Sequence, residues 1–312
     1  IIPSHTYSSS CYPFLKNKAK IVWADIDLET RVVSDDSILS NISNKTRAVV
    51  VPHLYGYFKD LTILKKELQN KDIILIEDVA QAIGTKIEDK MSGSIGDFSI
   101  FSFHSHKNIT TLGEGGMLVV EDEDLAIEIP KLRHNGHCDF DYTREEFWKP
   151  AMGNLDVTYV SDDLLLPNNF CITETQCALG ISLLNRVMEI NAKKRHRALY
   201  IIDELNNFDI LKFHRVETEQ HNYHLLAAYF DKTSLRDKFF RLMAEEESIQ
   251  CAVQYLPLNR YDFYKKLGYG ESNCPNSDFF FDHMVSFPFH HRLTDNEIDQ
   301  ILSSTKKILK KI

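Results

Sequence analysis

The sequence of 312 residues lacks the features of several large protein classes. Its net charge is −9, so it has no excess of the basic residues that bind nucleic-acid phosphates. No apolar run approaches the length that spans a bilayer, and no secretory signal is present. These absences favour a soluble, cytoplasmic protein with neither a nucleic-acid nor a membrane partner.

Cysteine and histidine give no sign of a metal site. The six cysteines have no Cys-x-x-Cys spacing, which predicts reduced thiols. Among the thirteen histidines, His104 and His106 would point to opposite faces of an extended segment. Ligands of one metal ion must converge, so we expect no metal site there.

Charged residues make up 26% of the chain and hydrophobic residues 43%, which is typical of a globular protein. Apolar segments predict strands at 21–26, 47–51, 73–76, 98–103 and 117–120. An amphipathic helix is predicted over 61–69. Alternating strands and helices predict an α/β fold with a mostly parallel sheet, in which ligands gather beyond the carboxyl ends of the strands.

The second half of the chain has a different pattern. Residues 134–166 lack periodicity, which predicts a long functional loop near the site. A helical pattern then begins at Thr173 and is predicted to run to Asn206. The remainder alternates strands and helices, with 223–229 as the best strand, and predicts a smaller α+β domain.

One lysine is placed where a fold can present a reactive amine. The apolar stretch 98–103 leads to Lys107 at the edge of the glycine-rich turn 113–116. Partial desolvation there lowers the pKa of a lysine and frees its amine for a Schiff base with a carbonyl. The buried strand 73–76 leads to Asp78. A lysine and an acid together indicate pyridoxal phosphate, whose ring nitrogen needs an acidic partner.

Lys107, Asp78 and the glycines each have an ordinary structural interpretation, as do two further candidate residues, Gln81 and Tyr7. Lys107 has the pattern of a surface lysine that snorkels, and Asp78 that of a helix N-cap. Gln81 would be a surface glutamine, and Tyr7 would pack in the core. The glycines at 113–116 would simply permit a tight turn.

The segments around Asp78 and Lys107 resemble the sugar aminotransferases of the DegT/DnrJ/EryC1/StrS family, which are fold type I pyridoxal-phosphate enzymes. The similarity covers nearly the whole chain, through segments at 2–7, 23–27, 52–56, 77–82, 169–174, 255–258 and 286–290. It implies a three-layer large domain over 1–180, of the aspartate-aminotransferase type, with a mostly parallel sheet. A connecting helix and a C-terminal small domain would occupy 181–312.

The resemblance also implies roles for individual residues. Lys107 would hold the cofactor covalently and carry the proton between the substrate carbon and the cofactor's C4′ atom. Asp78 would keep the ring nitrogen protonated, and Gln81 would lie near the phenolic oxygen. Tyr7 would stack on the ring, and Ser102 would bind the phosphate.

Part of this implied site lies outside a single copy of the sequence. Asn169 resembles an asparagine that reaches the phosphate of a second subunit, so a homodimer with shared active sites is expected. Cys171 stands where many relatives have arginine, so we expect different contacts there. The resemblance also implies a segment before Ile1 with a Gly-Thr turn that helps to hold the phosphate.

The resemblance implies an aminotransferase that converts a nucleotide-linked keto-deoxysugar into an amino sugar, with glutamate as amino donor. Two alternatives stay open. Some relatives are dehydratases with histidine in place of the lysine, but counting from Ser102 puts Lys107, and not His106, at the cofactor position. The other is a non-catalytic regulatory protein that kept the fold. The sugar, the aminated carbon and the nucleotide also stay open.

Overall fold

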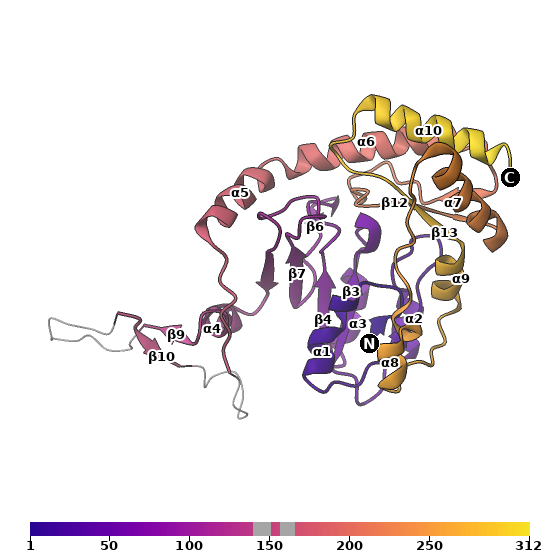
Figure 1. The fold of residues 1–312 in the computed structure, drawn as a ribbon. Helices are drawn as coiled ribbons and strands as arrows, with labels where there is room; N and C mark the ends of the chain where they lie inside the picture. Colours follow the sequence, from indigo (N-terminus) through magenta and orange to yellow (C-terminus); the bar gives the residue numbers. More distant parts are fainter. Residues whose placement is uncertain (140–150, 157–165) are drawn as a thin grey trace.

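The computed structural model describes residues 1–139, 151–156 and 166–312. Its largest sheet has the order β3-β4-β7-β8, with the first three strands parallel and the last antiparallel (Figure 1). The strands are β3 (Ala48–Pro52), β4 (Ile74–Asp78), β7 (Phe98–Ser102) and β8 (Gly116–Val120). The predicted α/β fold with a mostly parallel sheet is therefore confirmed.

Both faces of β3 are covered, which explains its uninterrupted apolar sequence. Val49 and Val51 share one core with Leu64 and Leu68 of α3 (Thr62–Gln69). Val50 lies in a different core, with Trp23 of β2 (Trp23–Ala24). The elements that precede α3 include β1 (Ile2–Pro3), which pairs in parallel with β2, and helices α1 (Tyr12–Lys16) and α2 (Asp35–Ser40).

An arm extends from the main sheet on the left of Figure 1. It contains α4 (Glu123–Arg133) and an antiparallel pair, β9 (His137–Cys138) with β10 (Asn154–Leu155). The prediction of an irregular loop over 134–166 is therefore wrong for this hairpin. The rest of that loop, 140–150 and 157–165, lies outside the described residues.

Two helices follow the arm where one was predicted. They are α5 (Glu174–Leu184) and α6 (Val187–Leu205). The break occurs because Arg186 leaves the helical backbone, with φ −113° and ψ 6°. Asparagine at 185 is a common helix-ending residue, since its side chain competes for backbone hydrogen bonds.

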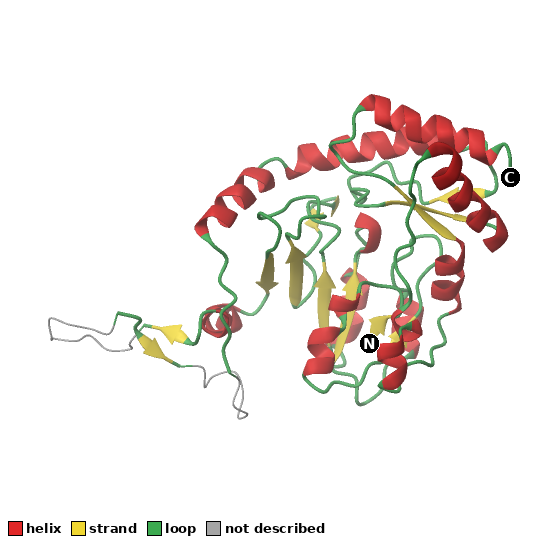
Figure 2. Cartoon of the chain, in the orientation of Figure 1, coloured by secondary structure: helices red, strands yellow, loops and turns green. Residues whose placement is uncertain are grey.

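A second, antiparallel sheet has the order β11-β12-β13. Its strands are β11 (Leu211–Phe213), β12 (Leu226–Phe230) and β13 (Met284–Phe287). Figure 2 shows helices lying over it, namely α6, α7 (Thr233–Glu247) and α10 (Asp295–Leu309). Phe230, Phe239 and Ile301 lie in one hydrophobic core at this contact.

The remaining elements are small. They are β5 (Lys86–Ile87), β6 (Lys90–Met91), α8 (Asp262–Lys266), α9 (Pro275–His283) and the 3-10 helices η1 (Ser8–Ser10), η2 (Leu54–Gly56) and η3 (Leu258–Arg260). Phe280 of α9 packs in the same core as Val49 of β3. Because this late segment returns to the first sheet, the division into domains 1–180 and 181–312 stays a prediction. In the part of the chain that the structure describes, no helix has the length and apolar character needed to cross a membrane.

A fully buried carboxylate fixes the loop that leads into β7. Glu77 accepts hydrogen bonds from the backbone N–H groups of Gly93 (2.9 Å), Ile95 (2.7 Å) and Gly96 (2.6 Å), and its Oε2 lies 2.9 Å from Nε2 of His53. Burial alone would raise the pKa of Glu77, but the hydrogen bonds from His53 and the backbone lower it below the ordinary 4.5. The stabilisation is therefore present above pH 4.5 and lost as the pH falls through the lowered pKa.

We expect Glu77→Leu to lower the free energy of unfolding by about 3–5 kcal/mol, because it leaves buried N–H groups without an acceptor. Urea unfolding at pH 7 measures this change. Glu67→Leu, on the exposed side of α3, is the matched control and should cost less than about 0.5 kcal/mol. Equal costs for the two variants would show that the Glu77 hydrogen bonds do not hold the loop.

Candidate active site

Three of the polar residues predicted for the site, Asp78, Ser102 and Lys107, lie at or just beyond one edge of the main sheet. Asp78 is the last residue of β4 and Ser102 the last residue of β7. These strands are parallel neighbours, so their carboxyl ends meet at the same edge. Lys107 follows in an irregular turn, where its N–H donates to the carbonyl of His104 at 2.9 Å.

The glycine-rich segment closes behind this turn. The N–H of Ser105 donates to the carbonyl of Gly113 at 2.8 Å, and the N–H of Phe103 donates to that of Gly115 at 2.8 Å. A Cβ atom at Gly115 would lie 2.0 Å from the Thr111 hydroxyl, so only glycine fits there. The need for a tight turn is therefore enough to explain glycine at this position, without a role in binding.

Lys107 is half-buried, as the sequence predicts for a reactive amine. Burial lowers the pKa of its ammonium group, and the negative charge of Asp78 opposes that shift. The two groups are therefore close enough to interact electrostatically. A lowered pKa increases the fraction of neutral amine near neutral pH, which is the nucleophilic form.

The carboxylate of Asp78 is held on both oxygens. Oδ2 accepts a hydrogen bond from the hydroxyl of Ser10 at 2.6 Å, and Oδ1 accepts one from the N–H of Ala80 at 3.1 Å. No helix starts here, because the chain turns over residues 80–84, so the N-cap interpretation of Asp78 is wrong. The sequence reasoning missed Ser10, for which the serine run that follows Tyr7 was the available signal.

Gln81 is 6% exposed, so the interpretation as a surface glutamine is wrong. Its Oε1 accepts from the N–H of Tyr55 at 2.7 Å, and its Nε2 donates to the hydroxyl of Tyr255 at 3.1 Å. Burial raises the pKa of Tyr255 to about 12, so its hydroxyl stays protonated. The role of Gln81 near the phenolic oxygen stays a prediction.

Tyr7 is 54% exposed, which contradicts packing in the core. Its ring meets that of Tyr255 edge to face, with centroids 5.7 Å apart and an interplanar angle of 66°. Because Tyr255 is also bonded to Gln81, the exposed face of Tyr7 lies beside the buried polar residues. Stacking on a cofactor ring stays a prediction.

Among the described residues, the hydroxyl of Ser102 has one long hydrogen bond, from the N–H of His104 at 3.4 Å, which leaves it able to bind a ligand. Asn169, in contrast, does not join the other predicted residues. It lies exposed, and it forms an antiparallel bridge with His134, just after α4. The next helix, α5, starts at Glu174 with Thr173 as its N-cap, as the helical pattern from Thr173 predicts.

The histidine argument also needs correction. Residues 104–106 form a turn instead of an extended segment, and the rings of His104 and His106 lie 5.0 Å apart. Their side chains therefore do not point to opposite faces. Across residues 1–139, 151–156 and 166–312, however, no three His, Cys, Asp or Glu side chains are grouped as a metal site requires.

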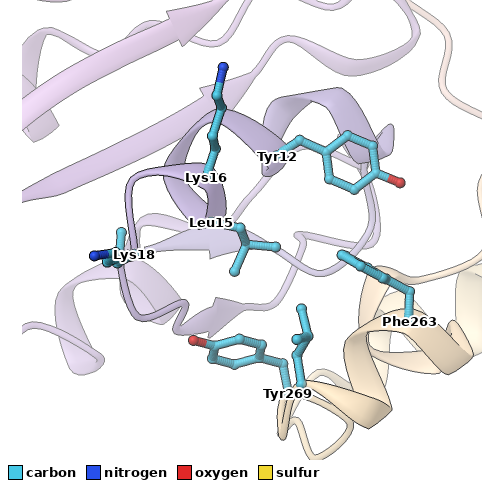
Figure 3. Close-up of a pocket in the computed structure, with 8 residues that line it drawn as sticks. Tyr12, Leu15, Lys16, Lys18, Phe263 and Tyr269 are labelled. Atoms are coloured by element: carbon cyan, nitrogen blue, oxygen red, sulfur yellow. The ribbon is translucent and has the colours of Figure 1, made fainter. Parts of the chain in front are cut away.

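A separate groove of about 470 Å³ lies between α1 and α8 (Figure 3). Tyr12, Leu15, Phe263 and Tyr269 form much of its wall. None of the residues predicted for the site lines it. We therefore place the chemistry at the sheet edge instead of in this groove.

The residues at the sheet edge fit pyridoxal phosphate by their chemistry. Lys107 offers an amine for an aldehyde, and Asp78 offers a carboxylate for a protonated ring nitrogen. Ser102 offers a hydroxyl for a phosphate, and Tyr7 an exposed ring for a planar ligand. Burial of the amine matches the need for a neutral nucleophile.

Comparisons with known proteins identify the family of this chain. The profile of the DegT/DnrJ/EryC1/StrS aminotransferase family matches residues 1–306. GDP-perosamine synthase of Vibrio cholerae is 27% identical over 98% of this chain and 78% of its own length. The aminotransferase structure from Psychrobacter cryohalolentis is 25% identical, with a TM-score of 0.88 over 100% of this chain and 80% of its own.

A third relative is described with its cofactor form. Spr1654 of Streptococcus pneumoniae, described as a sugar aminotransferase in its PLP form, is 25% identical. Its TM-score is 0.79, over 99% of this chain and 80% of its own. Together with the family match over nearly all 312 residues, these likenesses define the class of the protein. The chain belongs to the DegT/DnrJ/EryC1/StrS family and is a fold type I sugar aminotransferase, which implies pyridoxal phosphate as its cofactor.

Proposed function

We propose that this sugar aminotransferase acts on a keto-deoxysugar linked to a nucleotide and takes its amino group from glutamate. The observation that carries the proposal is the half-buried amine of Lys107, which interacts with the charge of Asp78 at the carboxyl edge of the sheet. A relative named GDP-perosamine synthase supports a nucleotide-linked sugar. The free cysteines suit a reducing compartment, so we propose a cytoplasmic location.

Each residue has a distinct task in this proposal. Bound pyridoxal phosphate supplies the electron sink that makes the substrate's C–H bond acidic. The Lys107 amine binds the cofactor covalently and later carries the proton. Asp78, oriented by Ser10 and the N–H of Ala80, holds a proton on the ring nitrogen.

The position of Lys107 favours amino transfer over the dehydratase alternative. His106, the histidine beside it, is exposed, whereas Lys107 is half-buried and interacts with Asp78. An exposed imidazole is more poorly placed than the half-buried amine of Lys107 to act beside the carboxylate. We therefore assign the proton transfer to Lys107 and leave His106 without a catalytic role.

The substrate class can be tested directly. The purified chain, with pyridoxal phosphate and glutamate, is offered keto-deoxysugars linked to TDP, UDP, GDP or CDP, and products are identified by mass spectrometry. We expect amination of one nucleotide-linked sugar and none of the same sugar without its nucleotide. Amination of the free sugar at an equal rate would contradict the nucleotide requirement.

The arm supports a homodimer with shared active sites. It extends away from the chain's own sheet edge in Figure 1, and it exposes the apolar side chains of Leu166 and Phe170, each 68% exposed. Met117 of the neighbouring strand β8 is 53% exposed. Apolar surface of this kind is typical of an interface. We propose that a second copy covers it and that Asn169 reaches the partner's phosphate site near Ser102.

Subunit mixing tests the shared site. Lys107→Ala and Asn169→Ala should each be inactive alone, because each lacks one group required at every site. A heterodimer of the two has one site damaged twice and one site intact, so mixing should restore about a quarter of wild-type activity. If exchange of subunits is complete and activity stays absent, the site is not shared.

A further inference from the structure

A buried lysine lies behind the Lys107 turn. Lys194, on α6, is 3% exposed, and its Nζ donates to Oδ1 of Asn108 at 2.9 Å and to the carbonyl of His224 at 3.0 Å. The ring of Phe289 lies 5.6 Å from this nitrogen. No acidic side chain forms an ion pair with Lys194 within the described residues, so a simple buried salt bridge does not explain its position.

The acceptor of Lys194 is the residue next to Lys107. Besides accepting from Lys194, Oδ1 of Asn108 lies 3.2 Å from Nδ1 of His224. Nδ2 of Asn108 donates to Oδ1 of Asn191 at 3.0 Å, one turn earlier on α6. The amide of Asn108 is therefore fixed in orientation from three sides, all of them buried.

Asn191, which binds Asn108, also contacts the segment that follows Asp78 and Gln81. Nδ2 of Asn191 donates to the carbonyl of Ile83 at 2.8 Å, two residues beyond Gln81. The next residue after Asn108, Ile109, shares a hydrophobic core with Ile83 and Val187 of α6. One face of α6 thus holds both the segment after Asp78 and the turn that carries Lys107.

We propose that Lys194 is a positioning residue which, through its hydrogen bond to Asn108, holds the Lys107 turn against α6 and keeps the Lys107 amine half-buried. The proposal rests on the proposed role of Lys107 as the reacting amine. The turn has no regular secondary structure of its own. Backbone bonds to the glycine-rich segment hold it on one side, and the contacts of Asn108 hold it against α6. Lys194 does not touch the reacting atoms, and its effect on them passes through Asn108.

The expected consequence follows from burial. Desolvation lowers the pKa of Lys107, so a turn that relaxes toward solvent raises that pKa toward its ordinary value. A rise of one pKa unit leaves about tenfold less neutral amine at a pH well below the pKa. Loss of the Lys194 hydrogen bond should therefore make Lys107 less nucleophilic at neutral pH, whether or not a substrate is present.

The test measures the amine itself. The cofactor-free full chain is labelled with acetic anhydride between pH 6.5 and 10.5, and peptide mass spectrometry follows Lys107. At pH 7.5 we expect Lys194→Met to slow labelling about five- to tenfold. Lys194→Gln keeps an N–H donor for Asn108 and should stay within about twofold of wild type. Circular dichroism verifies the fold of each variant.

Lys65→Met is the matched control. Lys65 is also buried, at 7% exposed, but it pairs with Asp97 at 2.5 Å and Glu121 at 3.0 Å on the other side of the fold. Its loss should leave the labelling of Lys107 unchanged. If Lys194→Met fails to fold, Asn108→Ala removes the same hydrogen bond and should slow labelling in the same way.

Three results would overturn the proposal. The first is unchanged labelling of Lys107 in Lys194→Met, or in Asn108→Ala where that variant replaces it. The second is equal slowing of labelling in Lys194→Met and Lys194→Gln. The third is slowing in Lys65→Met equal to that in Lys194→Met. The first shows that the contact does not position Lys107, the second that its hydrogen bond is not the cause, and the third that the effect is general destabilisation. Labelling needs no turnover, so a failure of the proposed function, seen as an active Lys107→Ala enzyme, is a separate result.

Discussion

Lys107→Ala is expected to lower the rate of amino transfer by more than about 10³-fold, because it removes both the covalent anchor and the proton carrier. The fold should persist, since Lys107 is only half-buried in an irregular turn and forms no ion pair that the structure shows among its described residues. Wild type loaded with pyridoxal phosphate should be yellow and lose that absorbance when glutamate is added. The Lys107→Ala variant should form no covalent bond to the cofactor, and its absorbance should not fall when glutamate is added.

The control for this experiment is Lys71→Ala, an exposed lysine before β4. It should keep wild-type turnover and the same response to glutamate. Thermal unfolding of both variants separates loss of chemistry from loss of fold. Wild-type turnover in Lys107→Ala would show that another group is the nucleophile.

Asp78→Asn is expected to slow proton transfer by about 10²- to 10³-fold while cofactor binding persists. The amide keeps the shape of the side chain and an oxygen for Ser10 or the N–H of Ala80, but it removes the charge that keeps a ring nitrogen protonated. Single-turnover kinetics with glutamate measure the step. Unchanged kinetics would reduce Asp78 to a structural residue.

Asp78→Asn, which slows proton transfer in the loaded enzyme, should make the Lys107 amine of the cofactor-free chain more reactive. The charge of Asp78 raises the pKa of Lys107, so its removal should lower that pKa further and speed the labelling of Lys107 in the cofactor-free chain. Asp36→Asn, an exposed change in α2, should alter neither quantity. Slower turnover together with faster labelling would distinguish the electrostatic role of Asp78 from damage to the fold.

The strands of the main sheet could be predicted because their local signal is strong. The apolar runs that become β3 and β4 are largely buried, and β4 ends in the acidic residues Glu77 and Asp78 at the carboxyl edge of the sheet. Asp78 ends β4, and Lys107 lies shortly after the parallel neighbour β7, so parallel pairing places both near the same edge of the sheet. The pattern could therefore predict the edge of the sheet at which these two residues lie.

The partners of these residues could not be predicted in the same way. Ser10 is 68 positions from Asp78, and Lys194 is 86 positions from Asn108, so only the folded chain brings them together. The turn at His104 likewise depends on backbone bonds from Phe103 and Ser105 to the glycine-rich segment. Periodicity carries no information about such contacts, because it reports burial and not the identity of a neighbour.

The points at which helices begin and end also could not be predicted from the sequence pattern, for a physical reason. The continuous helical pattern after Thr173 hides the break at Arg186, since apolar spacing resumes on the other side of it. The absence of a helix after Asp78 is similar, because Gln81 is held by Tyr55 and Tyr255 from distant segments. In both places tertiary contacts decide the backbone conformation.

The central claim is that Lys107 is the residue that binds the cofactor covalently. Borohydride reduction of the chain loaded with pyridoxal phosphate, followed by peptide mass spectrometry, tests it most directly. We predict one pyridoxyl group per chain, located on Lys107, and none when glutamate is added before the reduction. A pyridoxyl group on any other lysine, with Lys107 unmodified, would contradict the account.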